Sequence, residues 1–181
     1  TLTTGEVINQ KNYTVLVNDA FAKTLKDKTY PSAKLKLNGW EGTSAIQVTT
    51  EGLLEITTGH EGEGWWGCGA ELKAGGKGEN LSNFANGYLN FEMKGDTKSS
   101  FEIGFQTGSF SAGTQVNNYV IFNANGKNMV TGNWKKYSIK IADLLKDKNL
   151  EDVTSLIYFK GDKNFDGKKV TLKNIYYSQG K

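Results

Sequence analysis

Hydrophobic and polar residues alternate with a period of two along much of the chain. Three segments show the alternation most clearly, each with three apolar residues on one face: Leu89, Phe91 and Met93 in 88–95, Phe101, Ile103 and Phe105 in 99–108, and Tyr137, Ile139 and Ile141 in 134–141. Side chains that point alternately to two faces are typical of strands with one buried face. We therefore predict strands in these segments, with the apolar residues in a core.

Seven further segments have the same character or are rich in β-branched and aromatic residues: 13–19, 44–50, 53–58, 65–72, 117–124, 155–161 and 169–178. Runs of Gly, Asn, Asp, Ser and Lys separate several of them, as in 94–100, 123–128 and 161–169. About ten short strands with one apolar face each predict two antiparallel sheets packed face to face, an all-β sandwich. Helical spacing is limited to a turn or two after residue 141 and a short capped turn in 80–87.

Length and composition narrow the class of protein. The 181 residues fit one domain with a sizeable core, which we place at 13–181, with 1–12 as a linker or edge segment. The formal charge is only +3, and all 22 basic residues are lysine. Because arginine is the favoured residue for bidentate phosphate and base-edge contacts, its absence argues against nucleic-acid binding. Cys68 stands alone, which excludes an internal disulfide, and no apolar run approaches membrane-spanning length.

Catalytic chemistry has little support in the sequence. His60 is the only histidine, so a multi-histidine metal site is excluded and a nucleophile–histidine–acid triad is poorly supported. Paired carboxylates are a better candidate, since small β-sandwiches can be glycosidases. Glu61 and Glu63 share a Gly-rich turn, and Glu92 and Glu102 point outward on adjacent strand candidates. A small hydrolase or lyase therefore stays an alternative, and so does an adhesion or structural sandwich without a sugar site.

The order of several motifs is informative beyond the individual strands. The motifs are LVNDAF (16–21), NGWEGTSAIQV (38–48), GWWGCGAEL (64–72), NLSNFANGYLNFEMKG (80–95), GNWKKYSIKIADLL (132–145), SLIYFKGD (155–162) and VTLKNIYY (170–177). This succession, over roughly 13–178, resembles the galactose-binding-like β-jelly-roll carbohydrate-binding modules attached to β-glucanases, including the C-terminal domain of the exo-glucanase type.

The resemblance implies a non-catalytic jelly roll that binds one soluble β-glucan-type chain in a groove on a concave sheet. It also implies a monomer that forms part of a larger modular enzyme, holds the attached glycoside hydrolase near its substrate, and is secreted or displayed at a bacterial-type cell surface. No nucleic-acid or membrane partner is expected.

Sugar rings pack their C–H faces on aromatic side chains, while amides and carboxylates bond to their hydroxyls. The candidates for these roles are Trp40, Trp65, Glu102, Gln106, Asn117, Asn118 and Tyr119. Neighbouring residues of a strand point to opposite faces, so Trp65 and Trp66 must divide between ligand and core. The resemblance assigns Trp65 to the ligand and Trp66 to the core. Trp40 could equally brace the turn in which it lies, and the face of Tyr119 depends on a register that the sequence leaves open.

Two further assignments depend on the resemblance. It places Trp134, at the start of a strand, in the core. It also implies one structural calcium ion where the first and last strands meet, with Asp19 and Asn174 as ligands. Asn174 stands where the family pattern prefers aspartate, but its carbonyl oxygen is a ligand of the hard type that calcium takes.

Overall fold

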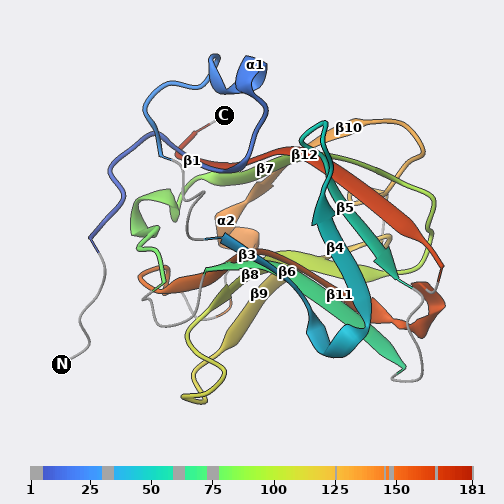
Figure 1. The fold of residues 1–181 in the computed structure, drawn as a ribbon. Helices are drawn as coiled ribbons and strands as arrows, with labels where there is room; N and C mark the ends of the chain where they lie inside the picture. Colours follow the sequence, from blue (N-terminus) through green and yellow to red (C-terminus); the bar gives the residue numbers. More distant parts are fainter. Residues whose placement is uncertain are drawn as a thin grey trace.

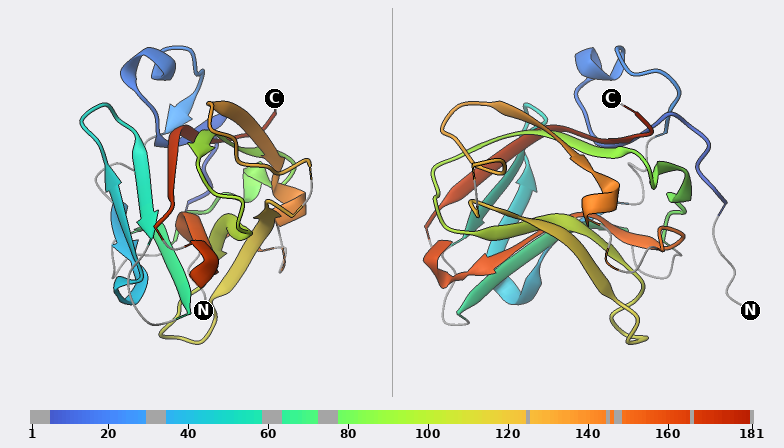
Figure 2. Two further views of the ribbon diagram at one scale, coloured as in Figure 1. Left: turned by 90° about the vertical axis from the view of Figure 1, so that its right-hand side faces the viewer. Right: turned by 180° about the vertical axis from the view of Figure 1, so that it is seen from behind.

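Two β-sheets lie face to face in the computed structural model, which describes residues 6–29, 35–58, 64–72, 78–124, 126–144, 146, 149–165 and 167–180. Seen from the front and from behind, β7 and β12 lie above β8 and β9, with the core between these layers (Figures 1 and 2). The protein is therefore an all-β sandwich, as the alternation predicted, and of the jelly-roll type that the resemblance implied.

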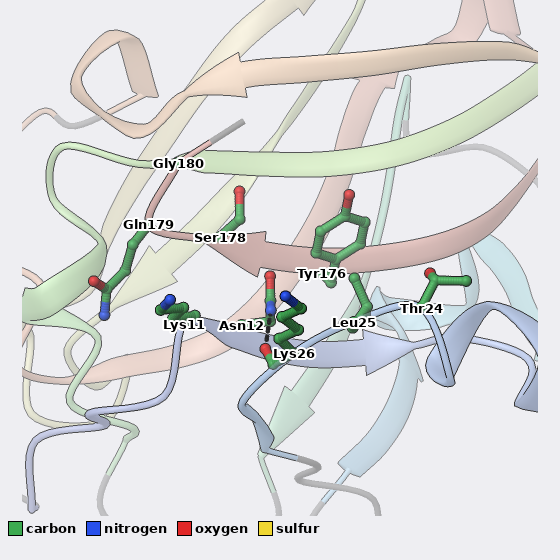
Figure 3. Close-up of a pocket in the computed structure, with 9 residues that line it drawn as sticks. All are labelled: Lys11, Asn12, Thr24, Leu25, Lys26, Tyr176, Ser178, Gln179 and Gly180. Atoms are coloured by element: carbon green, nitrogen blue, oxygen red, sulfur yellow. Dashed lines mark hydrogen bonds between the residues drawn. The ribbon is translucent and has the colours of Figure 1, made fainter.

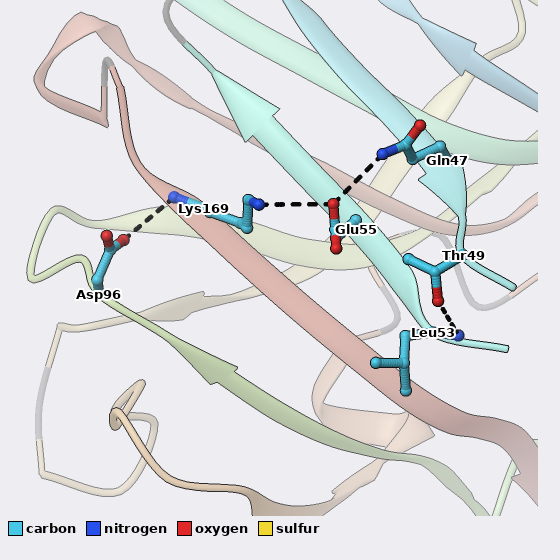
Figure 4. Close-up of polar contacts among 6 residues, drawn as sticks. All are labelled: Gln47, Thr49, Leu53, Glu55, Asp96 and Lys169. Atoms are coloured by element: carbon cyan, nitrogen blue, oxygen red, sulfur yellow. Dashed lines mark hydrogen bonds and ion pairs between the residues drawn. The ribbon is translucent and has the colours of Figure 1, made fainter. Parts of the chain in front are cut away.

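One sheet has seven strands. Its main path is β10 (Lys135–Lys140), β7 (Tyr88–Gly95), β12 (Lys169–Ser178), β1 (Asn12–Leu16) and β2 (Lys28–Thr29). The first half of β12 pairs instead with β5 (Leu54–Thr58), which pairs with β4 (Ser44–Val48). Figure 4 shows how side chains tie these strands together on the outer face: Lys169 Nζ lies 3.5 Å from a Glu55 carboxylate oxygen, which also accepts a 3.3 Å hydrogen bond from Gln47.

The other sheet has five strands, in the order β3 (Leu35–Gly39), β6 (Trp65–Leu72), β11 (Val153–Asp162), β8 (Phe101–Thr107) and β9 (Val116–Phe122). Helical structure is short throughout the described residues. It comprises α1 (Asp19–Ala22), α2 (Ile141–Leu144) and the 3₁₀ turns η2 (Trp40–Gly42), η3 (Ser82–Phe84) and η4 (Lys163–Phe165). No helix in these parts of the chain is long and apolar enough to cross a membrane.

The predicted inward faces are confirmed. All nine apolar residues of the three alternating segments are buried. Trp66 is also in the core, with 1 % of its surface exposed, and its ring centroid lies 4.5 Å from that of Phe165 and 6.1 Å from that of Phe101. Burying aromatic rings of this size contributes more to stability than any other apolar side chain of the sandwich.

Several elements were not predicted, among them β3 and α1. The segment that becomes β3 is short, with only two apolar positions, and pairs along β6. In α1, Asn18 caps the helix by accepting a 2.7 Å hydrogen bond from the Phe21 amide, and the Phe21 ring packs on Tyr176 of β12. This single turn is stabilised by packing on the sheet. It is too short to show a helical pattern of apolar residues, so the sequence did not predict it.

The prediction that Trp134 lies in the core is wrong. Residues 137 and 139 of β10 point inward, so alternation turns position 134 outward, and the indole is half-buried on the outer face of the seven-stranded sheet. There it lies beneath two ammonium groups, those of Lys94 and Lys173, at 4.9 and 4.3 Å from the ring centroid.

Cys68 offers a direct test of this packing. Its thiol is fully buried on the core side of β6, and burial raises its pKa to about 12. Because the thiolate is the reactive form, and a raised pKa keeps the thiol protonated below that pH, native protein at pH 8 should not react with Ellman's reagent. One thiol per chain should react once urea unfolds the domain. Equal rates in native and unfolded protein would contradict the packing of β6.

Candidate functional site

The outer face of the five-stranded sheet, which we call the platform face, gathers most of the predicted ligand-binding residues. Trp66, Cys68 and Ala70 of β6 belong to the core. Alternation therefore places Trp65, Gly67, Gly69 and Glu71 on the platform face. Tyr158 of β11 and Glu102 of β8 join them, because their neighbours Phe159 and Ile103 point inward.

The Trp40 indole lies directly over a glycine of β6. A methyl group added at Gly67 would stand only 2.3 Å from Trp40 Cε3, and one at Gly69 would stand 3.6 Å from Trp40 Cζ2. The absent side chain at Gly67 is what allows the ring to approach the strand so closely. The ring is also stacked beside Tyr158, with centroids 5.9 Å apart and an interplanar angle of 23°.

The turn that carries Trp40 is held to β6 by hydrogen bonds. Thr43 Oγ1 donates to the Trp40 carbonyl at 2.7 Å and accepts from the Gly67 amide at 3.0 Å. Glu41 and Gly42 adopt the left-handed conformation, with φ of 53° and 71°, which folds η2 back toward the sheet. The local sequence NGWEGT thus presents the indole on the platform face and braces the turn at once.

Trp65 lies on the other side of Gly67. Its Cζ3 atom is 3.2 Å from the position a Gly67 methyl would take, and its indole is half-buried. The ammonium of Lys160, from β11, lies 6.0 Å from the Trp65 ring centroid. Two half-buried indoles therefore meet over one glycine, with the tyrosine of β11 beside them. We call Trp40, Trp65 and Tyr158 the aromatic platform; Tyr158 is fully buried, so it supports the Trp40 ring while the two indoles provide the accessible surface.

Two carboxylates border the aromatic platform, and each is held by aromatic donors. Glu71 accepts hydrogen bonds from Asn38 Nδ2 at 2.9 Å and from Trp40 Nε1 at 3.2 Å. Glu102 accepts one from the Tyr158 hydroxyl at 3.0 Å. Burial, and then the charge of Glu102, raise the pKa of that hydroxyl, which keeps it a donor. Oxygens fixed in this way retain lone pairs for the hydroxyl groups of a ligand.

The far edge of the platform face is formed by β9. Tyr119 pairs with Gly104, which settles the open register and turns its half-buried ring outward, under the Lys146 ammonium at 5.0 Å. Asn117 also points outward. Gln106 is outward by alternation but only 2 % exposed, since it donates to Asn117 at 2.9 Å and accepts from Ser155 at 2.5 Å.

The prediction that Asn118 points outward is wrong. It follows Asn117 in the same strand, so the two side chains cannot share a face, and Asn118 is fully buried. Its side-chain oxygen accepts a 2.7 Å hydrogen bond from the Lys146 amide, which fixes the loop after α2 instead.

The carboxylates considered for catalysis are not brought together. Glu92 lies on β7 and Glu102 on β8, so they face outward from different sheets rather than across one site. His60, Glu61 and Glu63 lie outside the described residues.

The residues predicted as calcium ligands make no common contact in the structure. Asp19 is exposed in the first turn of α1. Asn174, in β12, donates from Nδ2 to Glu92 at 2.8 Å, and its buried Oδ1 has no hydrogen-bond partner. No three Asp, Glu, His or Cys residues of the described ranges gather in a possible metal site. Because calcium takes six to eight oxygens, these two residues alone do not make a site, and calcium stays a prediction.

Sequence reasoning missed three members of the site: Tyr158, Glu71 and Asn38. The signal for two of them was present. Glycines at 67 and 69, two residues apart, leave one face of β6 bare, and Glu71 continues that face. Tyr158 precedes the core residue Phe159 and so had to point outward. The contact between Trp40 and Glu71 spans 31 residues of sequence and left no local trace.

A cavity of about 450 Å³ lies away from the platform face. It is formed where the α1 segment passes over the end of β12, with Thr24, Leu25 and Lys26 facing Tyr176 and Ser178 (Figure 3). Tyr176 is the one aromatic residue among the described residues that line it, so the platform face remains the stronger candidate site.

The chain was then compared with known proteins. The family model of carbohydrate binding domain 30 matches residues 6–179, nearly the whole chain. The chain belongs to this family. Family 30 modules are non-catalytic, so the protein is a carbohydrate-binding module and not an enzyme. No curated protein is similar enough to the chain to count as a relative.

Solved structures agree with the fold of this family 30 module. One family 30 carbohydrate-binding module is 22 % identical with a TM-score of 0.60, covering 77 % of this chain and 89 % of that one. The family 30 module of the cellulosomal cellulase Cel9D-Cel44B of Clostridium thermocellum is 23 % identical with a TM-score of 0.57, covering 77 % and 84 %. A family 29 module variant in complex with cellulohexaose is 15 % identical with a TM-score of 0.53, covering 93 % and 91 %.

Proposed function

We propose that this family 30 module binds a single β-glucan-type chain along the platform face. The observation that carries the proposal is the pair of half-buried indoles, Trp40 and Trp65, that meet over Gly67 beside the Tyr158 ring. Flat aromatic surfaces suit the C–H faces of pyranose rings, and the fixed carboxylates of Glu71 and Glu102 suit their hydroxyls.

The register of the five-stranded sheet suggests the direction in which the polysaccharide crosses the platform face. Gly69, Tyr158, Gly104 and Tyr119 are successive cross-strand neighbours from β6 to β9. The Trp40 indole covers the Gly69 end of this row, and the half-buried Tyr119 ring faces outward at the other end, so both ends offer aromatic surface. We infer that a polysaccharide crosses the sheet along this row, with the aromatic platform at one end and Tyr119 at the other.

A β-linked glucan is the ligand class best supported. Structures of the same fold carry cellulohexaose in one case and mannohexaose in another, and one family 30 module belongs to a cellulase. We infer that this module is likewise attached to an extracellular glycoside hydrolase. An open face exchanges sugar–water for sugar–protein hydrogen bonds at small net gain, so affinity should be modest. Tethering to an enzyme then raises the local concentration of substrate.

Affinity electrophoresis across soluble polysaccharides tests the proposal. The panel should contain a β-1,3-glucan, a soluble derivative of a β-1,4-glucan, a mixed-linkage glucan, xyloglucan and galactomannan. We expect retardation on at least one β-glucan. Phe110→Ala, which removes an aromatic side chain 83 % exposed on the β8–β9 loop, is the matched control and should migrate like the native module. No retardation on any glucan, or retardation on the mannan alone, would overturn the β-glucan assignment.

A further inference from the structure

Trp134 has no part in the binding site proposed on the platform face. This tryptophan lies just before β10, on the outer face of the other, seven-stranded sheet, and its indole is half-buried. Lys94 of β7 and Lys173 of β12 hold their ammonium groups 4.9 and 4.3 Å from the ring centroid. Three strands thus converge on one aromatic ring that contributes nothing to the core.

The two ammonium groups have no carboxylate of their own. Within the described part of the chain, neither Lys94 nor Lys173 lies within ion-pair distance of an acidic side chain. Glu92 stands across from Lys173 in the register, but one of its oxygens accepts from Asn174 Nδ2 at 2.8 Å. Two like charges held against one ring repel each other, and an anion placed between them would relieve that repulsion.

The surface around Trp134 also carries mostly positive side chains. The outward positions of β7, β10 and β12 carry five lysines, of which Lys169 is paired with Glu55 of β5, and one glutamate: Lys94, Lys136, Lys140, Lys169, Lys173 and Glu92. The platform face is close to balanced, with Glu71, Glu102 and Asp162 against Lys36, Lys160 and Lys146. The two outer faces of the sandwich therefore differ in the charge of ligand that they favour.

We propose that the surface around Trp134 is a second glycan-binding site, for a polysaccharide that bears uronic acids. A uronate carboxylate between Lys94 and Lys173 would draw both flexible ammonium groups off the indole. The freed ring would then meet the C–H face of the same sugar. Exposed ion pairs of this kind are individually weak, so binding depends on repeated contacts along a polymer. This site is separate from the platform face, and neither proposal depends on the other.

Affinity electrophoresis in gels containing polygalacturonate, at low salt, tests the second site. Mobility is measured relative to the same variant in a gel without polysaccharide, which removes the direct effect of charge. We expect the native module to be retarded, and both Trp134→Ala and the double variant Lys94→Gln/Lys173→Gln to lose most of that retardation. Lys23→Gln/Lys163→Gln changes the net charge equally at exposed positions away from the indole and should keep it. Added NaCl at about 0.3 M should abolish it, since salt screens exposed charges.

Three results would overturn the second site. The native module could migrate unretarded in polygalacturonate, the control pair could lose retardation as fully as the Lys94/Lys173 pair, or Trp134→Ala could keep it unchanged. Cooperative thermal unfolding of Trp134→Ala with a midpoint close to that of the native module checks that the variant is folded. If that variant fails to fold, the comparison of the two lysine pairs decides alone. A module that binds no neutral glucan but passes this test would contradict only the proposed function.

Discussion

Replacing Trp65 by alanine is expected to abolish retardation in β-glucan gels while the domain stays folded. The side chain is half-buried on the platform face and is not part of the core cluster, so its loss removes the surface that the proposed function assigns to sugar stacking and little else. Aromatic residues at the centre of a binding site commonly contribute 2 kcal/mol or more, which corresponds to a loss of about 30-fold in affinity. The midpoint of thermal unfolding should move by no more than about 3 °C.

The neighbouring residue provides the matched control. Trp66→Ala makes the same substitution one position further along β6, but removes a ring that is 1 % exposed and packs against Phe101 and Phe165. Truncating such a ring typically costs about 3–5 kcal/mol of stability. We therefore expect Trp66→Ala to unfold at much lower urea concentration, whereas Trp65→Ala unfolds like the native domain. Full retardation of Trp65→Ala would remove the aromatic platform from the proposed function.

Strand positions and inward faces could be predicted because they follow from local alternation. The bounds of 65–72, 88–95 and 169–178 agree with β6, β7 and β12 residue for residue. Each of these strands has enough apolar residues on one face for the core to determine its orientation.

The errors arose where a resemblance or a register was used in place of that alternation. Trp134 was assigned to the core by family pattern, although the inward Tyr137 and Ile139 place it outward. Asn117 and Asn118 were both predicted to face outward, which no strand allows. Alternation along each strand was the better guide at both positions.

The composition of the site could be predicted only in part, since it depends on which strands become neighbours. Glu102 was identified from its own strand and Trp65 from the resemblance, but their relation to Tyr158 depends on β11 lying between β6 and β8. Trp40 reaches the site because η2 folds back over β6, and the sequence could not tell this from a bracing role. The structure shows that both descriptions of Trp40 hold together, through Thr43 and Gly67.

Gly67→Ala is expected to weaken binding at a position that no ligand needs to touch. The new methyl group would stand 2.3 and 2.8 Å from two ring atoms of Trp40, far inside contact distance. The indole must therefore lift from β6, which disturbs its 3.2 Å hydrogen bond to Glu71 and its stacking on Tyr158. Binding sites tolerate displacements of only about 0.5 Å, and we expect a loss of about tenfold in affinity, measured by titration with the retarding glucan.

Gly69→Ala is the control for this prediction, because it adds the same methyl group to the same face of β6 two residues away. Its nearest neighbours are Ile157 O at 3.3 Å, Tyr158 Cβ at 3.4 Å and Trp40 Cζ2 at 3.6 Å, so the indole need hardly move and affinity should be nearly unchanged. A double variant tests whether the added methyl group at Gly67 acts through its clash with Trp40. In a Trp40→Ala background, Gly67→Ala should cost little stability, because the 2.3 and 2.8 Å contacts with Trp40 are gone and only Trp65 Cζ3, at 3.2 Å, stays close. Equal losses of affinity for the two glycine variants, or a stability cost of Gly67→Ala that persists without the indole, would show that Gly67 does not act by seating Trp40.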